Sequence, residues 1–138
     1  MLARASQISQ LAAVGPLPAI NQIEYHPFVG ASVRATAAWC RRNGIAISAH
    51  SPLGSSKMAA DRSHLSNKLQ QVAHAHRLTG VQVLLRSSLD ENVSVVPGAT
   101  SRAHIEENLA SCDAQFSLTP AERRALSKEA KPQGWQRG

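Results

Sequence analysis

The chain has 138 residues, enough for one domain or part of one, and its 15 Lys and Arg against 9 Asp and Glu give a net charge of +6 with histidine neutral. A hydrophobic share of 43% favours a globular core over a long disordered tail, while the 4% of aromatic residues disfavours a nucleic-acid module that stacks bases. No run approaches the about 20 apolar residues that a membrane-spanning helix needs, and Arg4 with its polar neighbours interrupts any secretory hydrophobic segment.

The first half of the chain predicts two helices that alternate with two short apolar strands. In chain order these are a helix over 2–14, a strand over 19–25, a helix around 33–40 and a strand over 45–49. Gly15 and the two prolines after it end the first helix, and Gly44 lies where a C-cap glycine belongs. A loop rich in Ser, Gly and Pro then runs from His50 to about Ser63.

The second half predicts four helices and one strand. The ranges are helices around 65–76 and 79–88, a strand over 93–96, a helix that Ser101 caps and a helix that starts at the capping box 119–122. Thr79 is the expected cap of the second of these helices. Its inward face is expected to carry Val83, Leu84, Ser87 and Ser88.

Strands that alternate with helices, each strand an apolar run, indicate a parallel sheet with both faces covered. Only three strands can be counted, however, whereas a closed eight-stranded barrel needs about 250 residues. A free three-stranded parallel sheet would leave two edges unpaired. The sequence therefore predicts an incomplete α/β architecture.

Four ordered segments carry a family resemblance. They are Asn21-Gln22-Ile23-Glu24-Tyr25-His26-Pro27, residues 44–54, residues 82–98 and Ile105-Glu106-Glu107-Asn108-Leu109. In this order and spacing the chain resembles the C-terminal half of the aldo-keto reductases, from Leu2 to about Lys128. The resemblance implies a partial (β/α)8 TIM barrel: about the last three β/α units plus a C-terminal helix, in one incomplete domain over 1–138.

The resemblance also implies a binding site for the dinucleotide cofactor NADP or NAD. The residues it assigns to that site are Gln22, His50, Ser51, Leu53, Ser55, Gly98, Ala99, Thr100, His104, Glu107 and Asn108. The Gln22 amide would pair with the nicotinamide carboxamide, and His50, in a position usually held by an aromatic residue, would stack on the nicotinamide ring. The loop that starts at Ser51 would wrap the pyrophosphate, since short side chains let backbone N–H groups approach phosphate oxygens.

The segment 98–104 departs from the family pattern. It leads into a helix start, where free N–H groups favour an anion, but Gly98 and His104 replace the lysine and arginine that grip the 2′-phosphate of NADP in many members. Preference for NADP is therefore weakened and NAD use becomes credible, although Arg102 or a protonated His104 could substitute. Glu107 and Asn108 match the pair that contacts the adenine.

The implied activity is reduction of aldehydes or ketones to alcohols with NAD(P)H. The tyrosine that donates the proton and the lysine, aspartate and histidine around it belong to the first half of the family's barrel. Tyr25, the one tyrosine, lies in the strand motif and does not match it. No catalytic residue is therefore assigned. The isolated chain is expected to be inactive or nearly so unless an N-terminal half completes it, because the proton donor is missing and half a barrel cannot bury its own inner face.

Metal and redox chemistry find little support in the sequence. His74 and His76 are two apart on a helix and so diverge, and with His64 they are interpreted as helix-surface residues. The cysteines Cys40 and Cys112 have no CxxC partner and form no disulfide framework, so a reducing, cytoplasmic compartment is expected.

Two other classes of function remain open on the residues alone. One is a non-catalytic remnant or scaffold that pairs with a partner through its exposed strand edges. The other is a basic nucleic-acid binder, which a pI of 10.2 suggests but which the scatter of Lys and Arg, adjacent only at 41–42 and 123–124, disfavours. Without the resemblance, the loop after His50 would be interpreted as a Ser/Gly-rich connection with no ligand, and Gln22 as a polar strand residue that hydrogen-bonds to its neighbours. We therefore expect neither a nucleic-acid nor a membrane partner.

Overall fold

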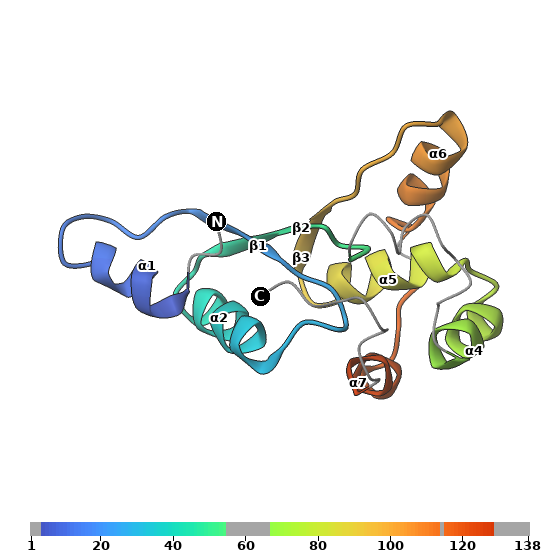
Figure 1. Cartoon of the computed structure of the whole chain (residues 1–138), viewed down its shortest axis with the longest axis horizontal. Helices are drawn as coiled ribbons and strands as arrows, with labels where there is room; N and C mark the ends of the chain where they lie inside the picture. The colour runs from blue at the N-terminus through green and yellow to red at the C-terminus, as the bar shows by residue number, and fades with distance from the viewer. Residues whose placement is uncertain (1–3, 55–66, 114, 129–138) are drawn as a thin grey trace.

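The computed structural model describes residues 4–54, 67–113 and 115–128. Six helices and three strands follow one another in this part of the chain (Figure 1). They are α1 (Ala5–Leu11), β1 (Ile20–Glu24), α2 (Ala31–Arg42), β2 (Ala46–His50), α4 (Asn67–His76), α5 (Gly80–Leu89), β3 (Val93–Val96), α6 (Arg102–Ala110) and α7 (Pro120–Ser127).

The three strands form one parallel sheet in the order β1-β2-β3. Gln22 of β1 lies opposite Ser48 of β2, and His50 at the end of β2 lies opposite Val96 at the end of β3. The carboxyl ends of all three strands therefore lie along one edge of the sheet. The predicted parallel sheet and the alternation of strands and helices are confirmed.

Local capping signals explain where three of the helices begin. The side-chain oxygens of Thr79, Ser101 and Thr119 each accept a hydrogen bond from the third residue of the following helix, as the sequence predicts. Gly44, just beyond α2, has a φ of +71°, the left-handed conformation that ends helices at glycine. The helix expected over 2–14 spans Ala5–Leu11 in the described residues, which begin at 4. It ends before 14 because the amides of residues 12–14 bond back three residues instead of four, in a tightened turn.

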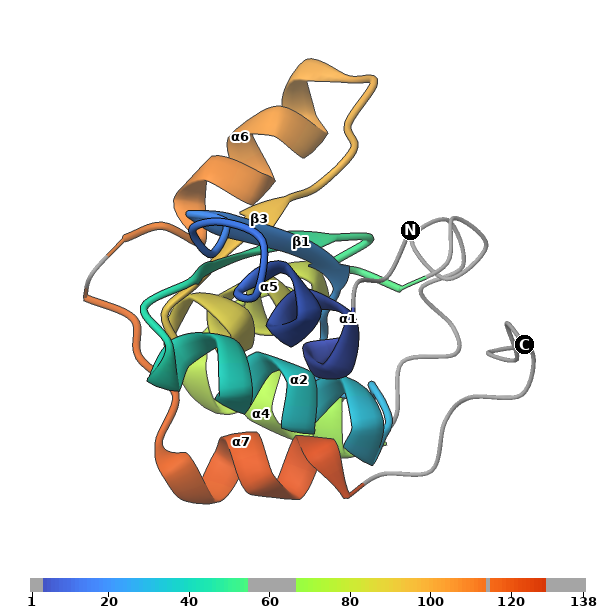
Figure 2. The same ribbon diagram turned by 90° about the vertical axis from the view of Figure 1, so that its left-hand side faces the viewer.

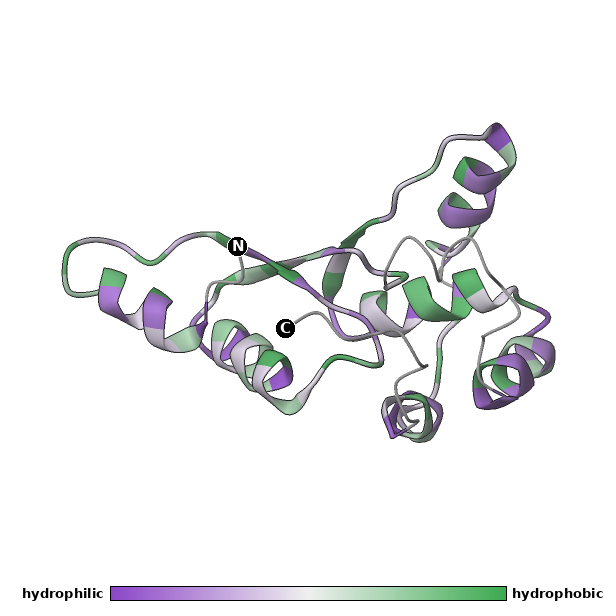
Figure 3. Ribbon diagram, viewed as in Figure 1, coloured by the Kyte–Doolittle hydropathy of each residue, from purple (hydrophilic) through white to green (hydrophobic). Residues whose placement is uncertain are grey.

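Two hydrophobic clusters lie on one side of the sheet. The first joins the sheet to α1 and α2, with Ile23, Ala37 and Cys40 all fully buried. The second joins α4, α5 and α7 through Leu69, Leu126 and their neighbours. Figure 2 shows α1, α2, α4, α5 and α7 on this side, whereas α6 projects from the other. The hydropathy colouring agrees: α5 is largely hydrophobic, and α6, which has no buried residue, is largely hydrophilic (Figure 3).

The opposite face of the sheet is bare among the described residues. The covering of both faces that the apolar strands predict is not found, whereas an unburied inner face is what half a barrel leads us to expect. Ile20 is 62% exposed and Val96 55% exposed, and Gln22 and Ser94 are exposed on the same face. Burial along β1 and β2 therefore alternates. No helix of the described residues is long and apolar enough to cross a bilayer.

Candidate functional site

A cavity of about 650 Å³ opens where β2 and β3 end. It is lined by Ser51, Pro52, Leu53, Gly54, Val96, Pro97, Gly98, Ala99, Thr100 and His104. Six of these were predicted from the sequence, namely Ser51, Leu53, Gly98, Ala99, Thr100 and His104. The lining thus comes from two segments about 45 residues apart in sequence, which meet because the parallel strands β2 and β3 end at the same edge of the sheet. This edge is the usual ligand side of such sheets.

The wall that follows β2 is a tight turn. The Gly54 amide donates to the Ser51 carbonyl over 2.8 Å, and both residues adopt positive φ, +48° at Ser51 and +82° at Gly54. A left-handed serine is strained by about 1 kcal/mol. Such turns aim successive N–H groups into one concavity, which suits an anion.

The wall that follows β3 leads into α6. Ser101 caps this helix by accepting from the His104 amide over 3.2 Å, and the His104 side chain lies at the cavity. His104 is the one titratable side chain among the described lining residues. Arg102 pairs instead with Glu106 at 2.7 Å on the exposed face of α6, and the described residues of the cavity wall include no lysine or arginine.

His50 and Gln22 lie on the bare face of the sheet beside the cavity. His50 Nδ1 is 3.3 Å from the Ser51 hydroxyl, which ties the ring to the turn. The Gln22 side-chain amide donates to Ser48 Oγ at 3.4 Å, one step further down the strands. Both side chains therefore share a face with the site without lining the cavity itself.

The structure does not bring every predicted site residue to the cavity. Glu107 and Asn108 lie half-buried on the last turns of α6, outside the lining, and the Glu107 carbonyl accepts from Gln82 of α5. Ser55 lies outside the described residues. Sequence reasoning missed Pro52, Gly54, Val96 and Pro97 as lining residues, although each one adjoins or lies between residues that it did assign.

Tyr25 lies away from this cavity, next to groups near the amino end of β3. Its hydroxyl donates to Glu91, and Arg41 of α2 lies 3.5 Å from the same oxygen. Burial raises the pKa of Tyr25, and the hydrogen bond to Glu91 raises it further. A tyrosine with a raised pKa holds its proton more tightly than an ordinary phenol. Elsewhere in the described part of the chain, no group of three His, Cys, Asp or Glu could hold a metal ion.

Comparisons with known proteins agree with this geometry. The model of a family described as "Aldo/keto reductase family" matches residues 3–125. The chain is 32% identical over 112 residues to a 9,11-endoperoxide prostaglandin H2 reductase of Trypanosoma cruzi, covering 80% of this chain and 37% of that protein. It is 31% identical to the methylglyoxal reductase DkgB of Escherichia coli O157:H7, covering 79% of this chain and 38% of that protein.

Solved structures give the same result. An aldo-keto reductase of Bombyx mori in complex with NADP matches with a TM-score of 0.78 and 30% identity over 90% of this chain and 41% of that one. The aldose reductase of Schistosoma japonicum matches with a TM-score of 0.76 and 28% identity, over 90% of this chain and 38% of its own. The chain thus spans about two fifths of the length of the proteins it matches.

Proposed function

Since the chain belongs to the Aldo/keto reductase family, as its match over residues 3–125 shows, we propose that it forms the cofactor-binding portion of an NAD(P)H-dependent carbonyl reductase. The cavity after β2 and β3 is the observation that carries this proposal. Its volume lies within the about 300–1,000 Å³ typical of small-molecule sites, and a related solved structure holds NADP. The bound dinucleotide would supply the hydride that reduces an aldehyde or a ketone.

The residues of the cavity fit the phosphates of such a cofactor. The turn at Ser51 and the start of α6 both line this concavity, where backbone amides that neither the turn nor the cap engages would meet phosphate oxygens. Gly98 leaves room, because a Cβ placed there would meet nothing within 4 Å. We assign the pyrophosphate to the turn that begins at Ser51 and includes Leu53, together with Ser55. The 2′-phosphate, when the cofactor is NADP, is assigned to the start of α6.

The two ends of the dinucleotide would meet other residues. Gln22 and His50 lie on the bare face of the sheet, where an amide could pair with the nicotinamide carboxamide and a flat imidazole could stack on its ring. Glu107 and Asn108 are assigned to the adenine, at the far end of α6 from the nicotinamide.

Cofactor preference follows from the charge of the cavity wall. Because Gly98 carries no side chain and Arg102 does not line the cavity, His104 is the one described lining residue that can place a positive charge near a 2′-phosphate, and only when protonated. We therefore propose that the chain accepts NADH at neutral pH at least as well as NADPH.

Titration of the chain with NADH and NADPH, followed by nicotinamide fluorescence, tests the site and the preference together. Gly98→Lys should tighten NADPH by about tenfold, since a charge-assisted contact contributes about 1.5–3 kcal/mol, and should leave NADH within twofold. Ala110→Lys adds the same charge at an exposed position of α6 outside the lining and is the matched control. Absence of binding by either dinucleotide would contradict the proposal.

Carbonyl reduction also needs a proton donor, and we propose that the donor lies outside this chain. Tyr25 is turned toward Glu91 and Arg41 rather than toward the cavity. We therefore expect the isolated chain to turn over little or no aldehyde until an N-terminal half of the barrel completes the domain. Steady-state oxidation of NADPH by the purified chain at roughly 1 s⁻¹ or faster, the rate of a whole enzyme, would overturn this expectation.

A second candidate function is a partner-binding scaffold, which the bare sheet face favours. Parallel sheets are normally covered on both faces, and the outer edges of β1 and β3, which pair with no other strand of the described residues, can pair with further strands. Mixing the chain with a separately produced N-terminal half, followed by size-exclusion chromatography and the NADPH assay, separates the two functions. Association with activity supports the reductase portion, and association without it supports the scaffold.

A further inference from the structure

A second cavity, of about 510 Å³, is lined by four arginines from two helices. Arg34 and Arg41 come from α2, and Arg123 and Arg124 from α7. Asp90 and Glu91, in the turn between α5 and β3, complete the charged lining. This turn precedes β3, so the cavity lies at the opposite end of that strand from the proposed dinucleotide site.

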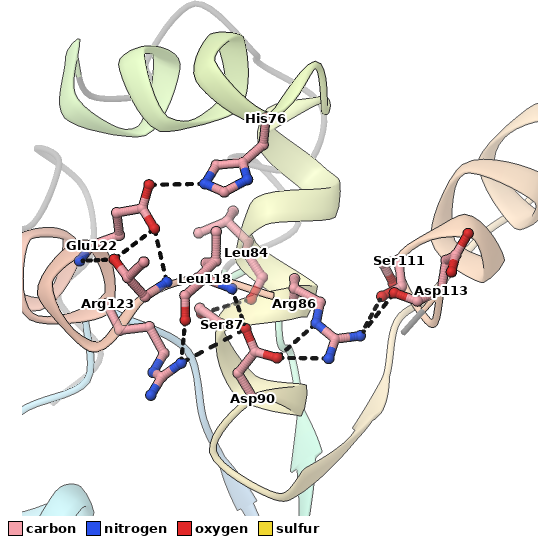
Figure 4. Close-up of polar contacts among 11 residues, drawn as sticks. His76, Leu84, Arg86, Ser87, Asp90, Ser111, Asp113, Leu118, Glu122 and Arg123 are labelled. Carbon is pink, nitrogen blue, oxygen red and sulfur yellow. Dashed lines mark hydrogen bonds and ion pairs between the residues drawn. The ribbon is translucent and has the colours of Figure 1, made fainter. Parts of the chain in front are cut away.

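The two carboxylates are already engaged by the protein itself. The Asp90 side chain is 4% exposed. Its carboxylate forms an ion pair with Arg86 at 2.6 Å, accepts a hydrogen bond from the Leu118 amide at 2.6 Å and lies 3.7 Å from the Arg123 guanidinium (Figure 4). Glu91 accepts the hydroxyl of Tyr25 and lies 3.5 Å from Arg41. Neither acid is therefore available to balance the remaining arginines.

Arg34 and Arg124 are left without a carboxylate among the described residues. The Arg34 guanidinium donates to the Pro27 carbonyl, which is neutral. Arg124 is exposed, and its guanidinium makes no bond with the part of the chain that the structure describes. Arg123 donates to the Leu118 carbonyl and shares Asp90 with Arg86. Like charges gathered around one concavity repel each other, and an anion between them relieves that repulsion.

We propose that this cavity binds a small, multiply charged oxyanion. Guanidinium groups present paired N–H donors that match phosphate and carboxylate oxygens two at a time. One such ligand would bridge guanidinium groups of α2 and α7 and so link these two helices. The site is independent of the dinucleotide cavity and needs no part of the proposed reduction.

Calorimetric titration of the full chain with inorganic pyrophosphate at low salt tests the site. NADH is present at saturation to occupy the dinucleotide cavity, because its Ser51 turn is itself assigned a pyrophosphate, and we expect saturable binding of one further ligand per chain. Arg124→Gln and Arg34→Gln should each weaken it about tenfold, the effect of one lost charge-assisted contact. Arg124 makes no bond within the described chain, so its variant keeps the test intact even if Arg34→Gln disturbs folding.

Two control variants distinguish binding in this cavity from general charge attraction and from binding at the dinucleotide cavity. Arg42→Gln removes the same charge one residue beyond Arg41 but outside the lining, and His104→Ala alters the dinucleotide cavity; both should leave pyrophosphate binding within twofold. Citrate in place of pyrophosphate distinguishes a polycarboxylate from a polyphosphate, and tighter binding of either supports the oxyanion site. Equal losses in Arg42→Gln and Arg124→Gln, loss in His104→Ala alone, or no saturable binding of either ligand would overturn it.

Discussion

The carboxylate of Asp90 connects several elements of the fold, and its removal should lower the free energy of unfolding strongly. Asp90 ends α5, accepts two nitrogens of Arg86 four residues earlier at 2.7 and 2.6 Å, and accepts the Leu118 amide at 2.6 Å (Figure 4). Its side chain is 4% exposed and that of Arg86 15%. Water can therefore replace little of what the carboxylate supplies.

The cost of Asp90→Ala follows from the groups it leaves behind. The Leu118 amide loses its acceptor, worth about 1–3 kcal/mol when buried, and the charge-assisted contact with Arg86 is worth about 1.5–3 kcal/mol. Arg86 retains weaker bonds to the carbonyls of Ser111 and Asp113. We expect a loss of about 3–5 kcal/mol in the free energy of unfolding, as for one broken buried ion pair, and about half of that for Asp90→Asn.

The chain contains a matched control for this experiment. Arg102 and Glu106 on α6 have the same four-residue spacing and a similar distance, 2.7 Å, but their side chains are 91% and 61% exposed. Glu106→Ala should therefore cost below about 0.5 kcal/mol. Urea unfolding followed by circular dichroism measures both variants. If Asp90→Ala and Glu106→Ala destabilise the chain equally, burial does not determine the strength of this pair and the reasoning is refuted.

Three further predictions concern burial and protonation. The single tyrosine makes phenolate absorbance a direct probe of Tyr25: its midpoint should lie above 10, and Glu91→Gln should lower it, because burial and then the bond to Glu91 raise the pKa. An unchanged midpoint in that variant would contradict the contact. Burial raises the pKa of Glu122, but bonds from its histidine and threonine neighbours outweigh this and hold the pKa below 4.5. The stability that Glu122 adds over Glu122→Gln is thus present above pH 4.5 and is lost as the pH falls through the lowered pKa, which urea unfolding at several pH values checks; a constant difference would contradict it. Ile23→Ala should cost about 2–5 kcal/mol, since Ile23 is fully buried, whereas Ile20→Ala on the bare face should cost little by the same assay.

The starts of α5, α6 and α7 were predictable because their causes are local. A threonine or serine hydroxyl three residues before a free amide is visible in the sequence, and Thr79, Ser101 and Thr119 all cap as expected. The end of α1 was not predictable to the residue, because the tightened turn at its end depends on backbone bonds that many sequences can make.

Longer-range relations were harder to predict. His76 was interpreted as a surface residue, yet it lies 2.8 Å from Glu122, 46 residues away, because α4 and α7 pack together. The bare sheet face could be expected only from the incomplete barrel, and the strand pattern itself predicts covered faces. In β2 the small residues Ala46 and Ser48 alternate with Ile47 and Ala49, so an exposed row resembles one continuous apolar run.

The cavity was predicted by resemblance, and its construction explains why six of the predicted residues meet there. Ser51, Gly98 and their neighbours follow paired strands, so the pairing of β2 with β3 alone brings them together. Glu107 and Asn108 depend in addition on the angle at which α6 leaves the sheet. No local pattern encodes that angle, and both lie outside the cavity lining.

The proposed site therefore divides into two parts with different requirements. The phosphate-binding part rests on contacts that this chain makes within itself: the pairing of His50 with Val96, the turn at Ser51 and the cap of α6. The nicotinamide part, with Gln22, lies on a sheet face that nothing in the described chain covers. A carbonyl reduction needs water excluded from the nicotinamide, and a bare face cannot exclude it. On our proposal, cofactor binding is a property of this chain, whereas catalysis requires the segment that covers that face.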